Sequence, residues 1–480
     1  MSGFDAATVA VEGALAAGAR YADARVMERR LESMTARNGD IDSLLQSEDA
    51  GVGVRALVGS SWGFFATPDL GDAAARAAGG RAAEIAAAST MVPGPPLDLI
   101  AAEARVDSWA SPCEEDPLSV PLAEKGDLLV AVTTTMKEQG ADIAAAAYNI
   151  WETRKWLVSS EGHRIDQHIR ECGALCEATV IGDGETQRRS YPGSRGQYGT
   201  RGWELVRSAD LEGNGARLAD EARALLSAPP CPEETTTLIL DSNQVMLQIH
   251  ESVGHAIEVD RILGWEAAFA GTSWLELSRL GSLRYGSELM NITADPTLSG
   301  ALGSFGYDDE GTPAARRDIV KDGIWVGVLA GRDSATVAGV GYGGSVRADG
   351  WNRLPMVRMT NVGLLPGDQS LEEMIASTPK GIYMTSNRSW SIDDKRLNFQ
   401  FGCEMAREVK DGQLGRILRN PTYTGIGPTF WQSMDMIGNQ SEWVFWGTPN
   451  CGKGQPLQIG HTGHPAVPAR FQNVRVGVRG

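Results

Sequence analysis

A cluster of prolines near the middle of the chain most constrains how it folds. The segment 228–232 reads APPCP, and each proline removes a backbone donor and fixes φ, so neither a helix nor a central strand runs through it. The chain has 480 residues, too many for one ordinary hydrophobic core. We therefore expect two domains, residues 1–228 and residues 234–480, with the proline cluster between them.

The first of these domains alternates Ala-rich segments with β-prone segments that turn signals separate. A hairpin turn is expected at 182–184, which reads GDG. We expect helices at 4–19, 72–88, 122–139 and 214–227. We expect strands at 22–27, 33–36, 51–58, 61–67, 143–152, 155–160 and 175–182. The pattern predicts an N-terminal α/β-mixed domain with antiparallel strands and Ala-rich helices.

The second domain differs from the first in its composition and its apolar pattern. A β-prone segment, 236–240, leads directly into a helical segment that begins near Ser242. The remainder, 265–480, is rich in glycine and short apolar runs, which favours mainly antiparallel β structure with few helices; one is expected at 371–377. The fold class predicted for the whole chain is therefore α+β.

Composition excludes several classes of function. The formal net charge of −17 would repel phosphate backbones, so nucleic acid is not expected as a primary ligand. The sequence contains no run of about 18 apolar residues, the length that a helix needs to span a bilayer. The N-terminus lacks the basic and apolar regions of a signal peptide. We expect a cytoplasmic protein without a membrane partner, whose cysteines stay reduced.

Two of the six histidines flank a glutamate in His250-Glu251-Ser252-Val253-Gly254-His255. Imidazoles are common zinc ligands, and an adjacent carboxylate can take a proton from water at the metal. The histidines are five residues apart, so on a regular α-helix their directions differ by about 140°. Both can bind one metal only if the helix widens locally, as in a π-bulge. Gly254 lowers the cost of such a distortion because it has no Cβ.

The residues alone leave a second interpretation open, an ordinary amphipathic helix whose histidines are solvated. A catalytic zinc site also needs a third protein ligand. Glu258 and Asp260 follow on the same segment. Cys451 is the distant alternative; it lies in a glycine-rich turn with Lys453 two residues on, and positive charge favours the thiolate.

With these residues in place, the sequence resembles the TldD/PmbA family of zinc-dependent peptidases, and specifically its metal-bearing TldD branch. The resemblance runs in order across 234–480 and includes the His-Glu…His motif with the trailing Glu258 and Asp260. Its further blocks are Asp308-Asp309-Glu310-Gly311-Thr312-Pro313, Leu354-Pro355-Met356-Val357-Arg358-Met359-Thr360-Asn361, Gly381-Ile382-Tyr383 and Cys451-Gly452-Lys453-Gly454-Gln455.

The resemblance implies a Zn²⁺ ion held by His250, His255 and Cys451, with Glu251 as the general base. It implies a metallopeptidase that cleaves small or unfolded peptides, including leader peptides of natural products. It also implies a dimer, either a homodimer or a heterodimer with a homologue that lacks the motif. The family's older description as gyrase modulators implies no DNA binding. Two other functions stay open: a zinc hydrolase of one small amide or modified-peptide intermediate, and a non-catalytic scaffold subunit.

Several other residues carry simpler interpretations. His461 and His464, which we do not associate with the family pattern, are expected to be polar surface. Cys172 and Cys176 are expected to bind no metal. The acidic run at 308–310 is either part of a substrate channel or a solvated turn. Arg358 meets either a peptide carboxylate or a neighbouring acid, and Tyr383 is expected in the core.

Overall fold

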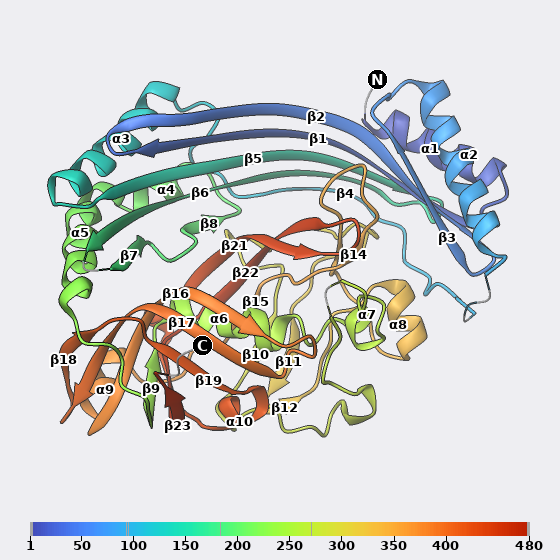
Figure 1. Ribbon diagram of the computed structural model, residues 1–480. Helices are drawn as coiled ribbons and strands as arrows, with labels where there is room; N and C mark the ends of the chain where they lie inside the picture. Colours follow the sequence, from blue (N-terminus) through green and yellow to red (C-terminus); the bar gives the residue numbers. More distant parts are fainter. Residues whose placement is uncertain (1–2, 93, 95, 183, 270, 478–480) are drawn as a thin grey trace.

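A long curved sheet forms the first part of the protein. The computed structural model describes residues 3–477 apart from 93, 95, 183 and 270. The sheet has eight strands in the order β3-β2-β1-β5-β6-β4, with β7 and β8 also paired to β6. Its longest strands arch over the rest of the chain, with helices at both ends of the arch (Figure 1). The strands are β1 (Tyr21–Arg37), β2 (Asp40–Val58), β3 (Ser61–Thr67), β4 (Val106–Ala110), β5 (Ile143–Ser159), β6 (Arg164–Gly182), β7 (Glu185–Tyr191) and β8 (Gln197–Gly199).

The four helices predicted for this part are present. The helices predicted at 4–19 and 214–227 differ from the observed helices by a few residues at one end. One pair packs together at one end of the arch and the others lie at the opposite end (Figure 1). The first pair is α1 (Gly3–Ala16) and α2 (Asp72–Ser89). The others are α3 (Leu122–Glu138), α4 (Glu204–Ser208) and α5 (Leu211–Ser227).

Two expected strand breaks are absent, and those predictions are wrong. The segments 22–27 and 33–36 belong to one strand, β1. The segments 143–152 and 155–160 also belong to one strand, β5, which ends at Ser159. Charged residues interrupt the apolar alternation there, but a central strand needs only partners for its backbone groups. β2 and β5 supply them along β1 from Asp23 to Arg37. The expected turn at 182–184 includes residue 183, which lies outside the described residues.

The second part lies under the concave side of the arch (Figure 1). Its main sheet runs β16-β9-β23-β19-β17-β18, with β20 paired to β23, and every pairing except β9 with β16 is antiparallel. This confirms the α+β class. The strands of this sheet are β9 (Glu234–Leu240), β16 (Lys380–Ile392), β17 (Asn398–Lys410), β18 (Gln413–Leu418), β19 (Thr422–Ile426), β20 (Met434–Ile437) and β23 (Ala469–Val476).

Smaller elements complete this part. A hairpin of β21 (Val444–Lys453) and β22 (Gln458–Ala466) lies between the main sheet and the arch (Figure 1). The short strands are β10 (Ile292–Ala294), β11 (Arg317–Lys321), β12 (Ile324–Trp325), β13 (Val346–Arg347), β14 (Met356–Val357) and β15 (Val362–Leu364). The helices are α6 (Ser242–Ile249), α7 (Val259–Ile262), α8 (Arg332–Ala338), α9 (Leu371–Ala376) and α10 (Gly427–Gln432). Among the described residues, no helix has the length and apolar character needed to cross a membrane.

Helix α6 is fixed at its start and along one side. Asp241 caps its N-terminus by accepting a hydrogen bond from the backbone N–H of Gln244 at 2.7 Å. Four apolar residues that recur every four positions from this helix into the next turns are completely buried in the largest core of the protein. They are Val245, Ile249, Val253 and Ile257. The backbone that carries the histidine motif is thereby held rigidly against the main sheet.

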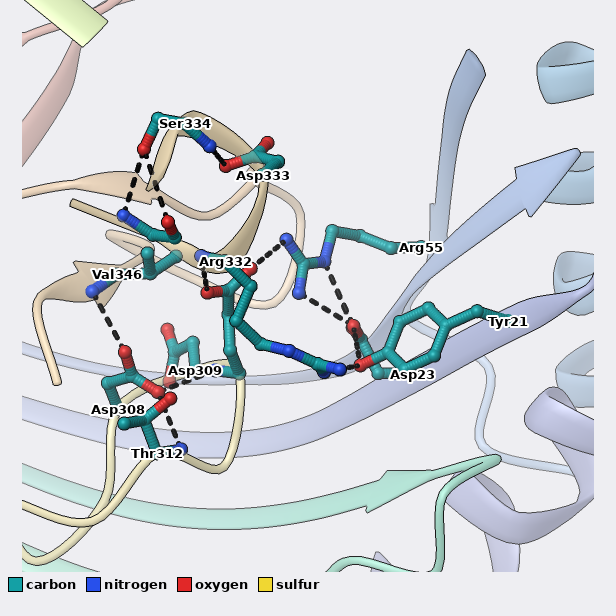
Figure 2. A network of polar contacts seen from close by, with 12 residues as sticks. Tyr21, Asp23, Arg55, Asp308, Asp309, Thr312, Arg332, Asp333, Ser334 and Val346 are labelled. Carbon is teal, nitrogen blue, oxygen red and sulfur yellow. Dashed lines mark hydrogen bonds and ion pairs between the residues drawn. The ribbon is translucent and has the colours of Figure 1, made fainter. Parts of the chain in front are cut away.

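The acidic run at 308–310 joins the two parts of the chain. All three side chains are buried, so the interpretation as a solvated turn is wrong. Asp309 pairs with Arg25 of β1 at 2.8 Å and with Lys155 of β5 at 2.5 Å. Glu310 pairs with Arg55 of β2, which also binds Asp23. Figure 2 shows Arg55 beside Asp23, with Asp308 and Asp309 across from them. Cations on the concave face of the arch thus hold the second part in place.

Replacing Asp309 by Asn should destabilise the protein by about 3–5 kcal/mol, because Arg25 and Lys155 would keep their charges in a buried site without a counter-charge. The measurement is the free energy of unfolding in urea at neutral pH. Asp318→Asn removes an exposed carboxylate that lies 3.4 Å from exposed Arg316, and should change stability by less than about 1 kcal/mol. Equal stabilities for the two variants would contradict this role of Asp309.

The same contacts predict acid sensitivity. Burial alone would raise the pKa of Asp309, but Lys155 and Arg25 outweigh it and hold that pKa well below the usual range. A carboxyl group with a depressed folded-state pKa stabilises fully above its unfolded pKa of about 3.9, and this stabilisation disappears as pH falls further. Wild type should therefore lose stability below about pH 4 more steeply than Asp309→Asn does. If the free energy of unfolding falls equally steeply with pH in wild type and in Asp309→Asn, this prediction is wrong.

Candidate metal centre

The backbone widens where the histidine motif begins. Helix α6 passes directly into a π-helical turn, His250–Gly254, in which the N–H of His255 donates to the carbonyl of His250 at 3.2 Å. The extra residue in this turn brings both rings to the same side, with centroids 4.9 Å apart. The expectation that five-residue spacing requires a π-bulge is therefore confirmed. Gly254 has a further role, because an added Cβ would lie 2.0 Å from the Met359 sulfur.

Three potential metal donors converge from distant parts of the chain. One nitrogen of His250, one of His255 and the Cys451 sulfur all lie within 4.8 Å of one another, and all three residues are buried. The Cys451 Sγ lies 3.7 Å from His255 Nε2. Cys451 reaches this position because β21 and β22 pair as a hairpin beside the π-helical turn. The alternatives Glu258 and Asp260 are not part of this group of donors.

Those two acids instead support the centre. Glu258 accepts from His255 Nδ1 at 3.0 Å, which leaves Nε2 of a neutral ring to face the Cys451 sulfur. Asp260 pairs with Lys453 at 2.8 Å, and Lys453 also lies 3.3 Å from Glu258. A carboxylate that binds the second nitrogen of a metal-ligating histidine fixes its tautomer and orientation.

His464 fixes the tautomer and orientation of His250 in the same way. The prediction that His464 lies on the surface is wrong. It is completely buried, and its Nε2 lies 2.7 Å from His250 Nδ1. Its own Nδ1 lies 2.8 Å from the carbonyl of Val362, which can only accept a hydrogen bond. Nδ1 therefore carries the proton of His464. Nε2, which also lies 3.1 Å from the Thr462 hydroxyl, is then the acceptor for His250 Nδ1–H. This pattern leaves His250 Nε2 with a free lone pair.

The ionisation of the two histidines suits a metal. Burial, and next the neighbouring His464, lower the pKa of His250 well below its usual value. Burial, and next Arg396, do the same for His255. Burial lowers the pKa of His464 to about 4. Neutral imidazoles are the metal-binding form. Burial raises the pKa of Cys451, and Arg358 opposes that shift.

Glu251 lies in the same buried site without joining the group of donors. Its Oε2 accepts from Arg396 Nη1 at 2.7 Å. Burial raises the pKa of Glu251, while Arg396 and then Arg195 oppose the shift. Two imidazoles and a thiolate form a donor set that favours zinc, and three protein ligands leave a fourth position for water or substrate. The residues present therefore fit a catalytic zinc ion.

The remaining sequence candidates lie elsewhere or have structural roles. Arg358 donates to the carbonyl groups of Cys451 and Gln458 rather than to an acid. His461 pairs with Glu171 at 2.9 Å. Tyr383 is only half-buried, in β16. Cys172 and Cys176 are buried in β6, and all six cysteines are free.

Sequence reasoning missed three residues around the centre. They are His464, Arg396 and Arg195. The signal for His464 was that it follows Cys451 closely in sequence across a segment that contains glycine and proline, an arrangement that can form a hairpin. Arg396 and Arg195 are isolated arginines in loops and gave none.

Three models of one family match successive segments of the chain. The PmbA/TldA metallopeptidase domain 1 matches residues 22–86, the central domain matches 115–226 and the C-terminal domain matches 233–477. A metalloprotease of Methanocaldococcus jannaschii is 28% identical over 448 residues, which cover 92% of this chain and 94% of the relative. A zinc metalloprotease TldD homolog of Saccharolobus solfataricus is 27% identical over 201 residues, 42% of this chain and 43% of the relative.

Solved structures share the fold. A proposed modulator of a DNA gyrase from Thermotoga maritima superposes with a TM-score of 0.78 at 17% identity, covering 99% of this chain and 100% of that one. TldE from Thermococcus kodakarensis gives a TM-score of 0.72 at 15% identity, with 98% and 99% covered. The C-terminal family model alone spans about half of the 480 residues, and the other two precede it in order. The chain belongs to the PmbA/TldD family of metallopeptidases.

Proposed function

We propose that this protein is a zinc-dependent peptidase that hydrolyses small or unfolded peptides, including leader peptides of natural products. The ligands are His250, His255 and Cys451, and Glu251 is the general base. The observation that carries the proposal is the convergence of these three donors within 4.8 Å in a chain of a metallopeptidase family. The name of the relative from Saccharolobus solfataricus supports zinc as the metal.

The chemistry that bound zinc supplies is Lewis acidity, which polarises the scissile carbonyl and acidifies the attacking water. Glu251 accepts the proton of that water and delivers it to the leaving amine. Arg396 holds the carboxylate of Glu251 in place at 2.7 Å. Burial raises the pKa of Glu251, which makes its carboxylate a stronger base. Glu258 and His464 hold the two imidazoles in the tautomer that leaves both Nε2 atoms free.

The assembly and location are part of the same proposal. We propose a dimer, formed with a second copy or with a homologue that lacks the motif; the fold shared with TldE supports the second form. The cytoplasmic location and the absence of nucleic-acid binding rest on the sequence alone. A scaffold role would not require a buried carboxylate beside three converging donors, so the arrangement favours catalysis.

Glu251→Gln should bind zinc as wild type does but cleave peptides about 10²–10⁴ times more slowly, because the amide cannot accept the proton. The measurement is mass spectrometry of a mixture of unfolded peptides, with zinc content determined in parallel. Glu276→Gln, which alters an exposed carboxylate, should behave as wild type. Full cleavage by Glu251→Gln would refute its role. If wild type cuts one small amide and none of the peptides, the narrower hydrolase is the correct function.

His464→Phe should weaken zinc binding about 10- to 100-fold, because His250 loses the acceptor that fixes its tautomer. The measurement is competition for zinc with a chromophoric chelator. His461→Phe is the matched control: it changes a histidine on the same strand whose partner is Glu171, and zinc affinity should stay unchanged. Equal affinities for the two variants would show that His464 does not support the metal centre.

A further inference from the structure

Arg195 brings the first part of the chain to the metal centre. It lies in the segment between β7 and β8, and its Nη1 donates to the Asn450 side-chain oxygen at 3.1 Å. Asn450 directly precedes Cys451. The guanidinium group also lies over the Trp390 ring, 4.4 Å from its centroid. Two contacts on different strands therefore fix this side chain beside a proposed metal ligand.

The charge of Arg195 has no matching acid. Within the described residues it forms no ion pair, and its Nη2 is buried without a hydrogen-bond partner. Burial lowers the pKa of Arg195, while Glu251 and then Cys451 oppose the shift from a distance. A partly buried cation without a counter-charge costs free energy, which an anionic ligand would offset. Arg396, on the same centre, differs because it already binds Glu251.

Other unsatisfied polar atoms lie next to Arg195. The Ser194 hydroxyl and both polar side-chain atoms of Asn243 are buried, and in the described structure they have no partner. Asn243 lies in the first turn of α6 and packs against Gly193, where an added Cβ would come within 2.2 Å of its Nδ2. Buried polar groups are almost always hydrogen-bonded, so a cluster of exceptions indicates a place for a polar ligand or water.

This cluster adjoins the proposed metal centre. Arg195 binds the residue next to Cys451, and Asn243 lies on α6, the helix that leads directly into the π-helical turn of the two histidines. A peptide bound at this group of donors would therefore lie beside the guanidinium group. A charged donor in such a site forms stronger hydrogen bonds to an anionic oxygen than to a neutral one.

We propose that Arg195 binds an anionic oxygen of the peptide substrate beside the metal centre. The inference rests on the peptidase function proposed above and adds a substrate-binding residue to it. Two oxygens have the required chemistry: the scissile carbonyl oxygen as negative charge develops on it, and the C-terminal carboxylate of the peptide. Asn450 and Trp390 hold the guanidinium group so that Nη2 remains for this contact.

The test uses a phosphinic tripeptide, whose tetrahedral phosphinate carries the charge that the scissile carbonyl acquires, as a free acid and as a C-terminal amide. Binding to the zinc-loaded protein is measured by calorimetry, and zinc content is measured for each variant. Arg195→Gln should weaken binding about 10- to 100-fold, because a charge-assisted hydrogen bond is lost. Arg195→Lys should weaken binding less than Arg195→Gln does. Arg201→Gln, which alters a more exposed arginine near Glu204, should bind within about twofold of wild type.

Comparing the free acid with the C-terminal amide shows which of the two oxygens Arg195 binds. Weakened binding of both forms assigns Arg195 to the reacting oxygen, and weakening of the free acid alone assigns it to the terminal carboxylate. Unchanged binding of both forms by Arg195→Gln overturns the inference and leaves the peptidase function intact. Loss of zinc from that variant also overturns it, because the guanidinium group would then only support Asn450 and Cys451. Failure of wild type to bind either form overturns the proposed function and the inference together.

Discussion

The widened turn at His250–Gly254 is the constraint on which the rest of the site depends. Its hydrogen bond from His255 N–H to the carbonyl of His250 spans five residues instead of the four of an α-helix, and this geometry lets two histidines five residues apart share a side. The turn is held from both sides: the apolar residues of α6 pack into the core, and Met359 fills the space that a side chain at position 254 would need. Cys451 can complete the group only because β21 runs alongside this turn.

Around the three donors, the protein provides hydrogen bonds that come from separate elements. His464 of β22 and Glu258 after the π-helical turn each bind one imidazole, and Lys453 of β21 binds Glu258. The arch contributes as well. Its strands hold the acidic segment through Arg25, Lys155 and Arg55, and the segment after β7 carries Arg195 to the centre. The site therefore requires both parts of the chain, although every proposed ligand lies in the second.

The sequence was most informative where a local pattern determines the structure. The spacing of His250 and His255 predicted a π-bulge, the Ala-rich segments predicted helices, and the glycine-rich second part predicted antiparallel strands. It failed where long-range pairing decides. The segments 22–27 and 33–36 were predicted as separate strands, but they belong to β1, whose backbone groups neighbouring strands satisfy throughout. His464, Asp309 and Glu310 are polar in sequence yet buried. Their partners His250, Arg25, Lys155 and Arg55 lie more than 100 residues away, so no local pattern indicates them. The division into domains 1–228 and 234–480 stays a prediction.

The central claim is that His250, His255 and Cys451 bind one zinc ion. X-ray absorption at the zinc edge tests it most directly, since nitrogen and sulfur ligands differ in distance, about 2.0–2.1 Å against about 2.3 Å. The zinc-loaded wild type should show one sulfur and two imidazole nitrogens, and the sulfur contribution should be absent in Cys451→Ser. A zinc shell without sulfur, or a sulfur contribution that survives this substitution, would contradict it.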